Sequence, residues 1–137
     1  MQNQIGFMVM KRVLIVDDDD LFLEGFDKVL QNAFIEVKTV DTGNAALQEI
    51  ASSHYDLCFL DLFLPDLNGT EVLKQMKKAS PRTKVIAMTA GVVTPSMQET
   101  IEKDAYMFIT KPLDLLQIRM LTRRIIEEAT EQTPAVN

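Results

Sequence analysis

The chain alternates short apolar runs with longer amphipathic stretches along most of its length. Continuous apolar runs predict buried strands, because a strand that is covered on both faces shows no polar alternation. Stretches with apolar residues three or four positions apart predict helices that pack on the strands. We expect strands at 13–17, 35–40, 55–61, 84–89 and 106–110, and helices at 20–32, 42–52, 68–78, 95–103 and 113–129.

The pattern within these segments predicts which side chains face inward. The run 35–40 alternates apolar and polar residues, which is typical of an edge strand with one exposed face. Asp19 or Asp20 is expected to cap the first helix, where a carboxylate also suits the helix dipole. Residues expected on the inner face of the first helix are Leu21, Phe22, Phe26, Val29 and Leu30, and in the last helix Leu116, Met120 and Ile125.

Alternation of five strands with five helices predicts an α/β fold, a doubly wound (βα)₅ parallel sheet with helices on both faces. Right-handed crossovers leave few topologies, and the flavodoxin-like strand order 2-1-3-4-5 fits best. In that order Asp61 ends the central strand, between the strands that end near Asp17 and Thr89. Ligands of such folds bind at the carboxyl ends of the strands, so these side chains should converge.

The residues at the strand ends suit phosphoryl chemistry. Asp17, Asp18 and Asp61 would repel one another unless a cation offsets their charge, and Mg²⁺ prefers oxygen ligands of this kind. Lys111, after the fifth strand, adds a second positive charge. A carboxylate beside a metal ion and a lysine can act as a nucleophile toward phosphorus. The Thr89 hydroxyl could then sense the modification.

Each of these residues taken singly also has an ordinary explanation. The acidic run 17–20 could serve only as turn and cap, and Lys111 could be a surface lysine. The four features fall at the ends of four separate strands on one edge of the predicted sheet. That coincidence favours a shared chemical site over four independent loop residues.

At these residues the sequence resembles the receiver domain of two-component response regulators. The resemblance covers about residues 11–129, and its motifs are Val13-Leu14-Ile15-Val16-Asp17-Asp18, Asp61-Leu62-Phe63-Leu64-Pro65 with Gly69, Thr89-Ala90 and Lys111-Pro112.

The resemblance implies a role for each residue of the transfer and switch machinery. Asp61 matches the phosphoacceptor, and Lys111 matches the phosphate-binding lysine, whose bond to Pro112 is often cis in the family. Thr89 matches the switch hydroxyl and Phe108 the switch aromatic. Phosphorylation is then expected to shift the balance between two conformations.

The resemblance also implies a magnesium site. Asp17 and Asp18 match the acidic pair, which would hold Mg²⁺ together with Asp61. Phe63 matches the position whose backbone carbonyl completes the site, so its side chain is not expected to be a ligand.

The implied function is that of a phosphoacceptor switch and not a turnover enzyme. The expected partners are a sensor histidine kinase or phosphotransfer protein, an output domain or protein partner, and a second copy on phosphorylation. Two alternatives remain open: a receiver-like adaptor that is never phosphorylated, and an aspartate-nucleophile phosphatase. Phosphatases of that class usually carry a second Asp two residues after the nucleophile, where this chain has Phe63.

Two further positions bear on how long a phosphoryl group would last. Phe63 and Gly91 each stand two residues after a site residue and flank the expected path of hydrolytic water. Neither side chain can orient water, so we expect slow loss of the phosphoryl group.

Composition limits the remaining choices. The 137 residues fit one domain, and 47% of them are hydrophobic, enough for a packed core. The net charge of −6 disfavours direct nucleic-acid binding, and no run reaches the ~20 apolar residues of a membrane span. The single cysteine, Cys58, suits a cytoplasmic protein.

We expect a flexible extension at 1–10, the receiver domain at 11–130 and a tail or linker at 131–137. His54 and the cluster Lys74, Lys77 and Lys78 are interpreted as surface residues.

Overall fold

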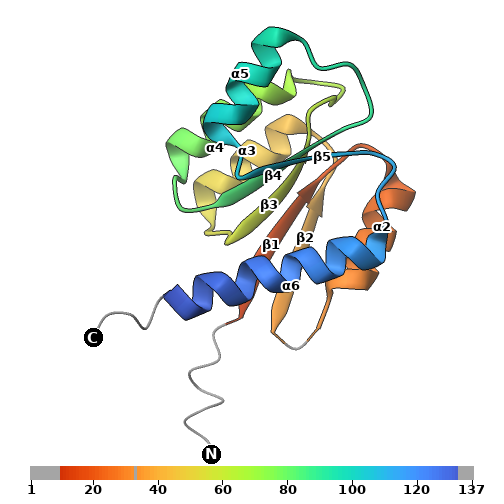
Figure 1. Ribbon diagram of the computed structural model, residues 1–137, viewed down its shortest axis with the longest axis vertical. Helices are drawn as coiled ribbons and strands as arrows, with labels where there is room; N and C mark the ends of the chain where they lie inside the picture. The colour runs from red at the N-terminus through yellow and green to blue at the C-terminus, as the bar shows by residue number, and fades with distance from the viewer. Residues whose placement is uncertain (1–9, 33, 133–137) are drawn as a thin grey trace, which may run out of the picture.

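The computed structural model describes residues 10–32 and 34–132, which form one five-stranded parallel sheet (Figure 1). The strand order is β2-β1-β3-β4-β5, so the predicted fold class and strand order are confirmed. The strands are β1 (Lys11–Val16), β2 (Ile35–Val40), β3 (Leu57–Asp61), β4 (Lys84–Thr89) and β5 (Met107–Thr110). The helices are α2 (Asp20–Leu30), α3 (Gly43–Ser52), α4 (Gly69–Ala79), α5 (Pro95–Asp104) and α6 (Leu115–Gln132).

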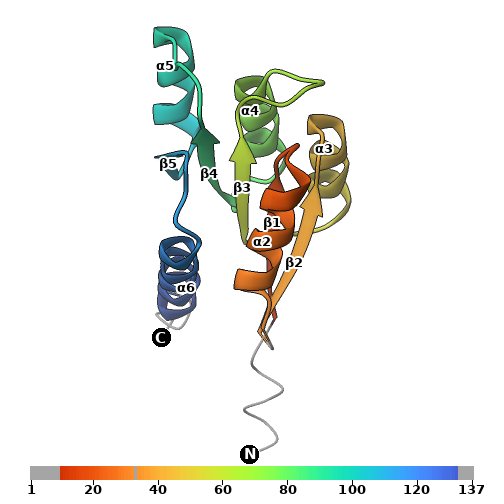
Figure 2. The ribbon, with the colours of Figure 1, turned by 90° about the vertical axis from the view of Figure 1, so that its right-hand side faces the viewer.

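The helices cover the sheet from both sides. Figure 1 shows α3, α4 and α5 on one face and α2 and α6 on the other, and Figure 2 shows the arrows of β2, β3 and β4 pointing the same way. Two hydrophobic cores result. Alternate residues of one strand face opposite cores, as Leu14 and Val13 do in β1. Both residues are fully buried, which explains why the central strands are apolar without alternation.

Polar caps fix where the helices begin. The Asp19 side chain accepts hydrogen bonds from two N–H groups of the first turn of α2, which confirms one of the two predicted caps. Thr42, Asn68 and Thr94 cap α3, α4 and α5 in the same way. Each cap satisfies N–H groups that a helix start leaves without an internal partner. The caps thus fix the helix starts beside the carboxyl edge of the sheet.

The inner face of α2 differs in part from the prediction. Leu21 was expected to face inward but is 79% exposed. The buried residues are Leu23, Phe26 and Leu30, which lie three and four positions apart on one stripe, and Leu21 falls outside that stripe. The helix also ends at Leu30 and not at residue 32.

The last helix shows the same kind of departure. Leu116 and Met120 were expected to face inward but are 62% and 63% exposed. Among the side chains of α6 that the structure describes, the buried ones are Ile118, Thr122 and Ile125. Their spacing places Leu116 and Met120 on the opposite side of the helix. Sequence alone misassigned them because α6 carries apolar residues around much of its circumference.

The edge strand, the cysteine and the histidine have the environments that the sequence predicts. β2 is an edge strand, as predicted, and Cys58 is fully buried while His54 is exposed. Most of the predicted extension and tail, residues 1–9 and 133–137, lies outside the described residues. The boundaries of the receiver domain at 11–130 stay a prediction. In the described part of the chain, no helix has the length and apolarity needed to cross a membrane.

Thr122 generates a prediction about stability. Among the described residues, its hydroxyl is the one buried side-chain polar group without a hydrogen-bond partner. A buried unpaired hydroxyl loses its hydration without compensation. Thr122→Val should therefore raise the free energy of unfolding by about 1 kcal/mol, because it replaces the hydroxyl with a methyl group. Urea denaturation followed by circular dichroism would measure this, and Thr122→Ser, which keeps the hydroxyl, should not stabilise the protein.

Candidate functional site

Strand register brings the predicted acidic residues together at one edge of the sheet. Val16 pairs with Leu60, so Asp17 and Asp61 follow neighbouring positions of β1 and β3. Carboxylate oxygens of Asp17, Asp18 and Asp61 lie within 4.8 Å of one another. Asp17 and Asp61 are buried, whereas Asp18 is exposed. The predicted convergence of the three carboxylates is therefore present, with one of them open to solvent.

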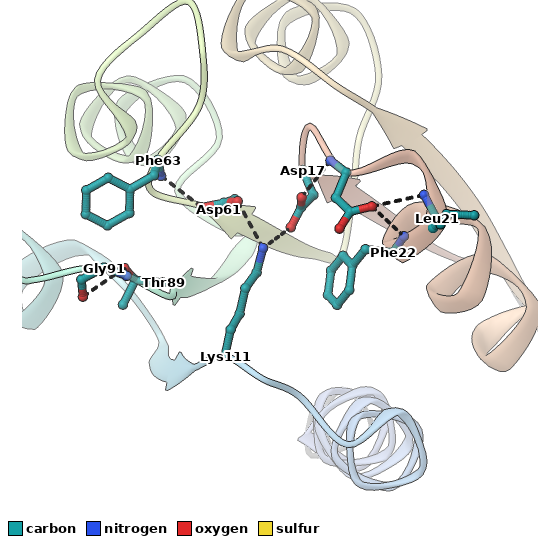
Figure 3. A network of polar contacts seen from close by, with 9 residues as sticks. Asp17, Leu21, Phe22, Asp61, Phe63, Thr89, Gly91 and Lys111 are labelled. Atoms are coloured by element: carbon teal, nitrogen blue, oxygen red, sulfur yellow. Dashed lines mark hydrogen bonds and ion pairs between the residues drawn. The ribbon is translucent and has the colours of Figure 1, made fainter.

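Lys111 joins the two buried carboxylates (Figure 3). Its ammonium group donates to Asp17 Oδ2 at 2.5 Å and to Asp61 Oδ2 at 3.1 Å. The same group lies 4.7 Å from the centre of the Phe22 ring, whose face attracts a cation. The lysine thus reaches from the end of β5, across the end of β4, to the centre of the sheet. Its bond to Pro112 is cis.

Backbone N–H groups orient the other carboxylate oxygens. Asp17 Oδ1 accepts from the Asp19 N–H at 2.9 Å, and Asp61 Oδ1 accepts from the Phe63 N–H at 2.8 Å. In both cases the donor lies two residues further along the chain, in the loop after the strand. The loops therefore fix the side chains that precede them.

The charges of the site are only partly balanced. Burial raises the pKa of the Asp17 carboxyl, and the hydrogen bond from Lys111 opposes this effect. Burial alone would lower the pKa of Lys111, but its hydrogen bonds to Asp17 and Asp61 hold that pKa above the ordinary value. Lys111 is therefore charged at neutral pH. One ammonium group faces three carboxyl groups, which leaves a local excess of negative charge.

This donor set fits a divalent metal ion. All three side chains offer oxygen, the ligand type that Mg²⁺ and Ca²⁺ prefer. Asp18 is the solvent-exposed member of the set, and its carboxylate lies within 4.8 Å of the buried pair. The role predicted for the Phe63 backbone carbonyl stays a prediction, since the hydrogen bond described beside the carboxylates is the one that the Phe63 N–H group donates to Asp61.

Thr89 lies at the same edge, but its hydroxyl is engaged with its own loop. Thr89 Oγ1 accepts the Gly91 N–H at 2.9 Å, and no hydrogen bond to Asp61 is found among the described residues. Gly91 in turn lies under the Phe63 ring, because a Cβ atom at Gly91 would stand 2.9 Å from two ring carbons. Phe63 as a residue is 45% exposed. Phe63 and Gly91, which were both expected to flank the path of hydrolytic water, thus lie against each other.

Phe108 lies within β5, two residues before the end of that strand. It lies on β5 opposite Ala87 of β4, is half-buried, and packs against the core beneath α3, α4 and α5. It also lines a groove of about 460 Å³ with Pro112 and residues of α6. Its position between core and groove is compatible with a switch role, which stays a prediction.

Asp66 is a site residue that the sequence analysis missed. Its carboxylate accepts the Gly43 N–H at 2.8 Å and the Asn44 N–H at 2.9 Å, at the start of α3. These hydrogen bonds, with Asn44 contributing most, lower the pKa of the Asp66 carboxyl. The bonds tie the loop that carries Phe63 to a helix more than twenty residues earlier. Nothing in the local pattern around Asp66 signals such a distant partner.

Comparison with known proteins assigns the family. The response regulator receiver domain family model matches residues 13–123, most of the chain. The chain belongs to this family. The receiver domain has 30% identity over 122 residues with the regulatory protein AtoC of Escherichia coli, an alignment that covers 86% of this chain and 26% of AtoC. The chain therefore spans about a quarter of the length of that relative. Receiver domains are phosphoacceptor switches and not enzymes with a separate turnover substrate.

Solved structures agree with this assignment. The receiver domain resembles a CheY-like response regulator receiver protein from Methanospirillum hungatei, with a TM-score of 0.79 and 28% identity over 89% of this chain and 98% of that one. It also resembles the response regulator TrrA from Thermotoga maritima, solved in complex with Mg²⁺-BeF, with a TM-score of 0.74 and 28% identity over 85% of this chain and 99% of that one.

The contact between Asp66 and α3 predicts a pH-dependent contribution to stability. A carboxyl whose pKa is lowered on folding stabilises the protein above its unfolded pKa, and this contribution is lost as the pH falls through the folded pKa. Asp66→Asn should therefore lower the midpoint of thermal unfolding at pH 7, because the charged acceptor is lost. The difference from wild type should shrink as the pH falls toward and below 3.8, the ordinary pKa of an aspartate carboxyl. A difference in the midpoint of thermal unfolding that is the same at pH 7 and at acidic pH would contradict this account.

Proposed function

We propose that Asp61 is the phosphoacceptor of this receiver domain and takes a phosphoryl group from the phosphohistidine of a sensor kinase or phosphotransfer protein. The observation that carries the proposal is the placement of the Asp61 carboxylate. One of its oxygens faces Lys111, the other accepts the Phe63 N–H, and two further carboxylates lie beside it.

The transfer follows from this arrangement. An Asp61 carboxylate oxygen attacks phosphorus, the P–N bond to the donor imidazole breaks, and its electron pair returns to the ring nitrogen. Lys111 can move from the carboxylates to the phosphoryl oxygens and offset their negative charge. Mg²⁺, held by Asp17, Asp18, Asp61 and the Phe63 carbonyl, would supply the remaining positive charge when bound.

The switch rests on a competition for the Thr89 hydroxyl. In the unmodified protein this hydroxyl accepts the Gly91 N–H at 2.9 Å and donates a long hydrogen bond to the Gly91 carbonyl at 3.5 Å. A phosphoryl group on Asp61 offers it a charged acceptor, and hydrogen bonds to charged groups are stronger than neutral ones. We propose that Thr89 then turns toward Asp61 and that Phe108 follows. The face formed by α5, β5 and α6 would thereby change for an output domain, a protein partner or a second copy.

The context of the domain is part of the same proposal. We place it in the cytoplasm, without direct contact to nucleic acid or membrane, as the regulatory unit of a signalling protein. The relative AtoC is described as a regulatory protein and is about four times longer than the matched region. Phe63 stands where aspartate-nucleophile phosphatases carry their general acid, so its side chain cannot serve that reaction.

Acetyl phosphate provides a direct test of the phosphoacceptor. Incubation of the protein with acetyl phosphate and Mg²⁺ should add the mass of one phosphoryl group, as measured by intact mass spectrometry. Asp61→Asn should remain unmodified, because an amide is a poor nucleophile, and a chelator should prevent the reaction of the wild type. Asp27→Asn, in α2 and outside the acidic cluster, serves as a control and should still react. A wild-type protein that stays unmodified would favour the adaptor alternative.

The Phe63 ring predicts a long phosphoryl lifetime. Phe63→Asn should speed loss of the phosphoryl group several-fold, because an amide can position water where the ring now covers Gly91. The rate would be followed by mass spectrometry after removal of the phosphodonor. Val92→Asn, at an exposed position of the neighbouring loop, should leave the rate unchanged. Slower loss in Phe63→Asn would contradict the prediction.

A further inference from the structure

A groove lined by charged side chains lies on the side of the sheet that α3, α4 and α5 cover. A groove of about 490 Å³ runs between α4 and α5, which lie side by side in Figure 1. We call it the lysine groove. It lies along the C-terminal halves of the two helices, away from the acidic edge where α4 begins. Its lining residues are Lys74, Lys77, Lys78, Glu99, Thr100, Lys103 and Asp104.

The structure changes the interpretation of the lysine cluster. From sequence, Lys74, Lys77 and Lys78 formed a solvated helix face. They occupy positions i, i+3 and i+4 of α4, so they lie on the same side of the helix. Lys103 of α5 lies across the groove from them. The positive charges therefore line the groove from both helices. Solvation of one face of α4 alone does not account for this arrangement.

The four ammonium groups of the lysine groove lack acidic partners. Within residues 10–32 and 34–132, no salt bridge joins any of them to a carboxylate, although Glu99 and Asp104 also line the groove. The hydrogen bond found for this set is a long one, from Lys77 to the Pro81 carbonyl at 3.4 Å. All four side chains are exposed. The groove thus holds four ammonium groups and two carboxyl groups, and within the described residues none of the four ammonium groups is paired with a carboxylate.

Helix capping explains only part of this arrangement. Lys77 and Lys78 lie in the last turn of α4 and Lys103 in the last turn of α5, where cations are favoured by the helix dipole. Lys74 lies near the middle of α4, outside the reach of that effect. The dipole also gives no reason for the lysines of two helices to face the same hollow.

We propose that the lysine groove binds an acidic segment of a partner protein. The chain as a whole carries a net charge of −6, so its surface repels anions in general and attracts them here. Three lysines along about one helical turn match carboxylates that are spaced similarly on a partner helix.

The chemistry of the lining favours a peptide over a small ligand. Small-molecule sites are mostly apolar, with a few fixed polar groups, whereas this groove is lined entirely by charged residues and one threonine. Lysine binds as a point charge and lacks the planar fork with which arginine grips phosphate. Separate carboxylates on a peptide suit four separate ammonium groups better than one compact phosphate does.

The test uses the full 137-residue chain and a fluorescein-labelled alanine-based helical peptide with glutamates at i, i+3, i+4 and i+7. Fluorescence anisotropy at low salt should show binding that weakens as salt is raised, because exposed charges are screened. The same peptide with glutamines should bind at least tenfold more weakly. The double variant Lys77→Glu with Lys103→Glu should lose at least tenfold in affinity.

A charge-matched variant separates the groove from net charge. Lys28→Glu with Lys38→Glu changes two exposed lysines outside the groove and alters the net charge by the same amount. It should bind as the wild type does within about twofold. Equal loss in both double variants, or tighter binding of pyrophosphate than of the glutamate peptide, would overturn the proposal. If the reversal variant fails to fold, Lys74→Gln with Lys103→Gln should still show weakened binding. Asp61→Asn should bind normally, so this test does not depend on the phosphoacceptor proposal.

Discussion

The contact of one lysine with two buried carboxylates is the interaction on which the site depends. Asp17 and Asp61 sit side by side because the strands that precede them are hydrogen-bonded neighbours. Two buried negative charges at this separation would raise each other's proton affinity and oppose the close packing of the strand ends. Lys111 relieves that repulsion by donating to both groups. The sheet places the two carboxylates side by side, and Lys111 offsets their mutual repulsion.

The same arrangement leaves the site in need of further positive charge. A cluster with one ammonium and three carboxyl groups is still negative, and its exposed member, Asp18, faces solvent. Binding of a cation would stabilise such a site, because it offsets the remaining negative charge. The Thr89 hydroxyl accepts the Gly91 N–H, and the Phe63 ring lies close to Gly91. Asp61 therefore lies between the charged groups of the site, Lys111 among them, and the loop contacts made by Phe63 and Thr89.

Much of the fold and the acidic cluster could be predicted from sequence, because both arise from regular patterns. Val13 to Val16 and Leu57 to Leu60 are apolar without interruption, and that alone indicates strands covered on both faces. Parallel order then places Asp17 and Asp61 at a common edge. The failures occur where the pattern is ambiguous, as at Leu116, where an apolar residue lies on the solvent side of an amphipathic helix. The link between Asp66 and α3 could not be predicted, since it depends on how two loops meet in space.

The sequence distance between Lys111 and its partners has a consequence for how the protein is made. Lys111 follows Asp17 by 94 residues and Asp61 by 50. A ribosome releases both carboxylates long before it releases the ammonium group that compensates them. A domain generally folds as a unit, and any earlier pairing of β1 with β3 would place Asp17 beside Asp61 before Lys111 has been synthesised. Docking of the last strand is thus the step that completes the electrostatics of the nascent protein, and translation must pass residue 111 before the native charge balance exists.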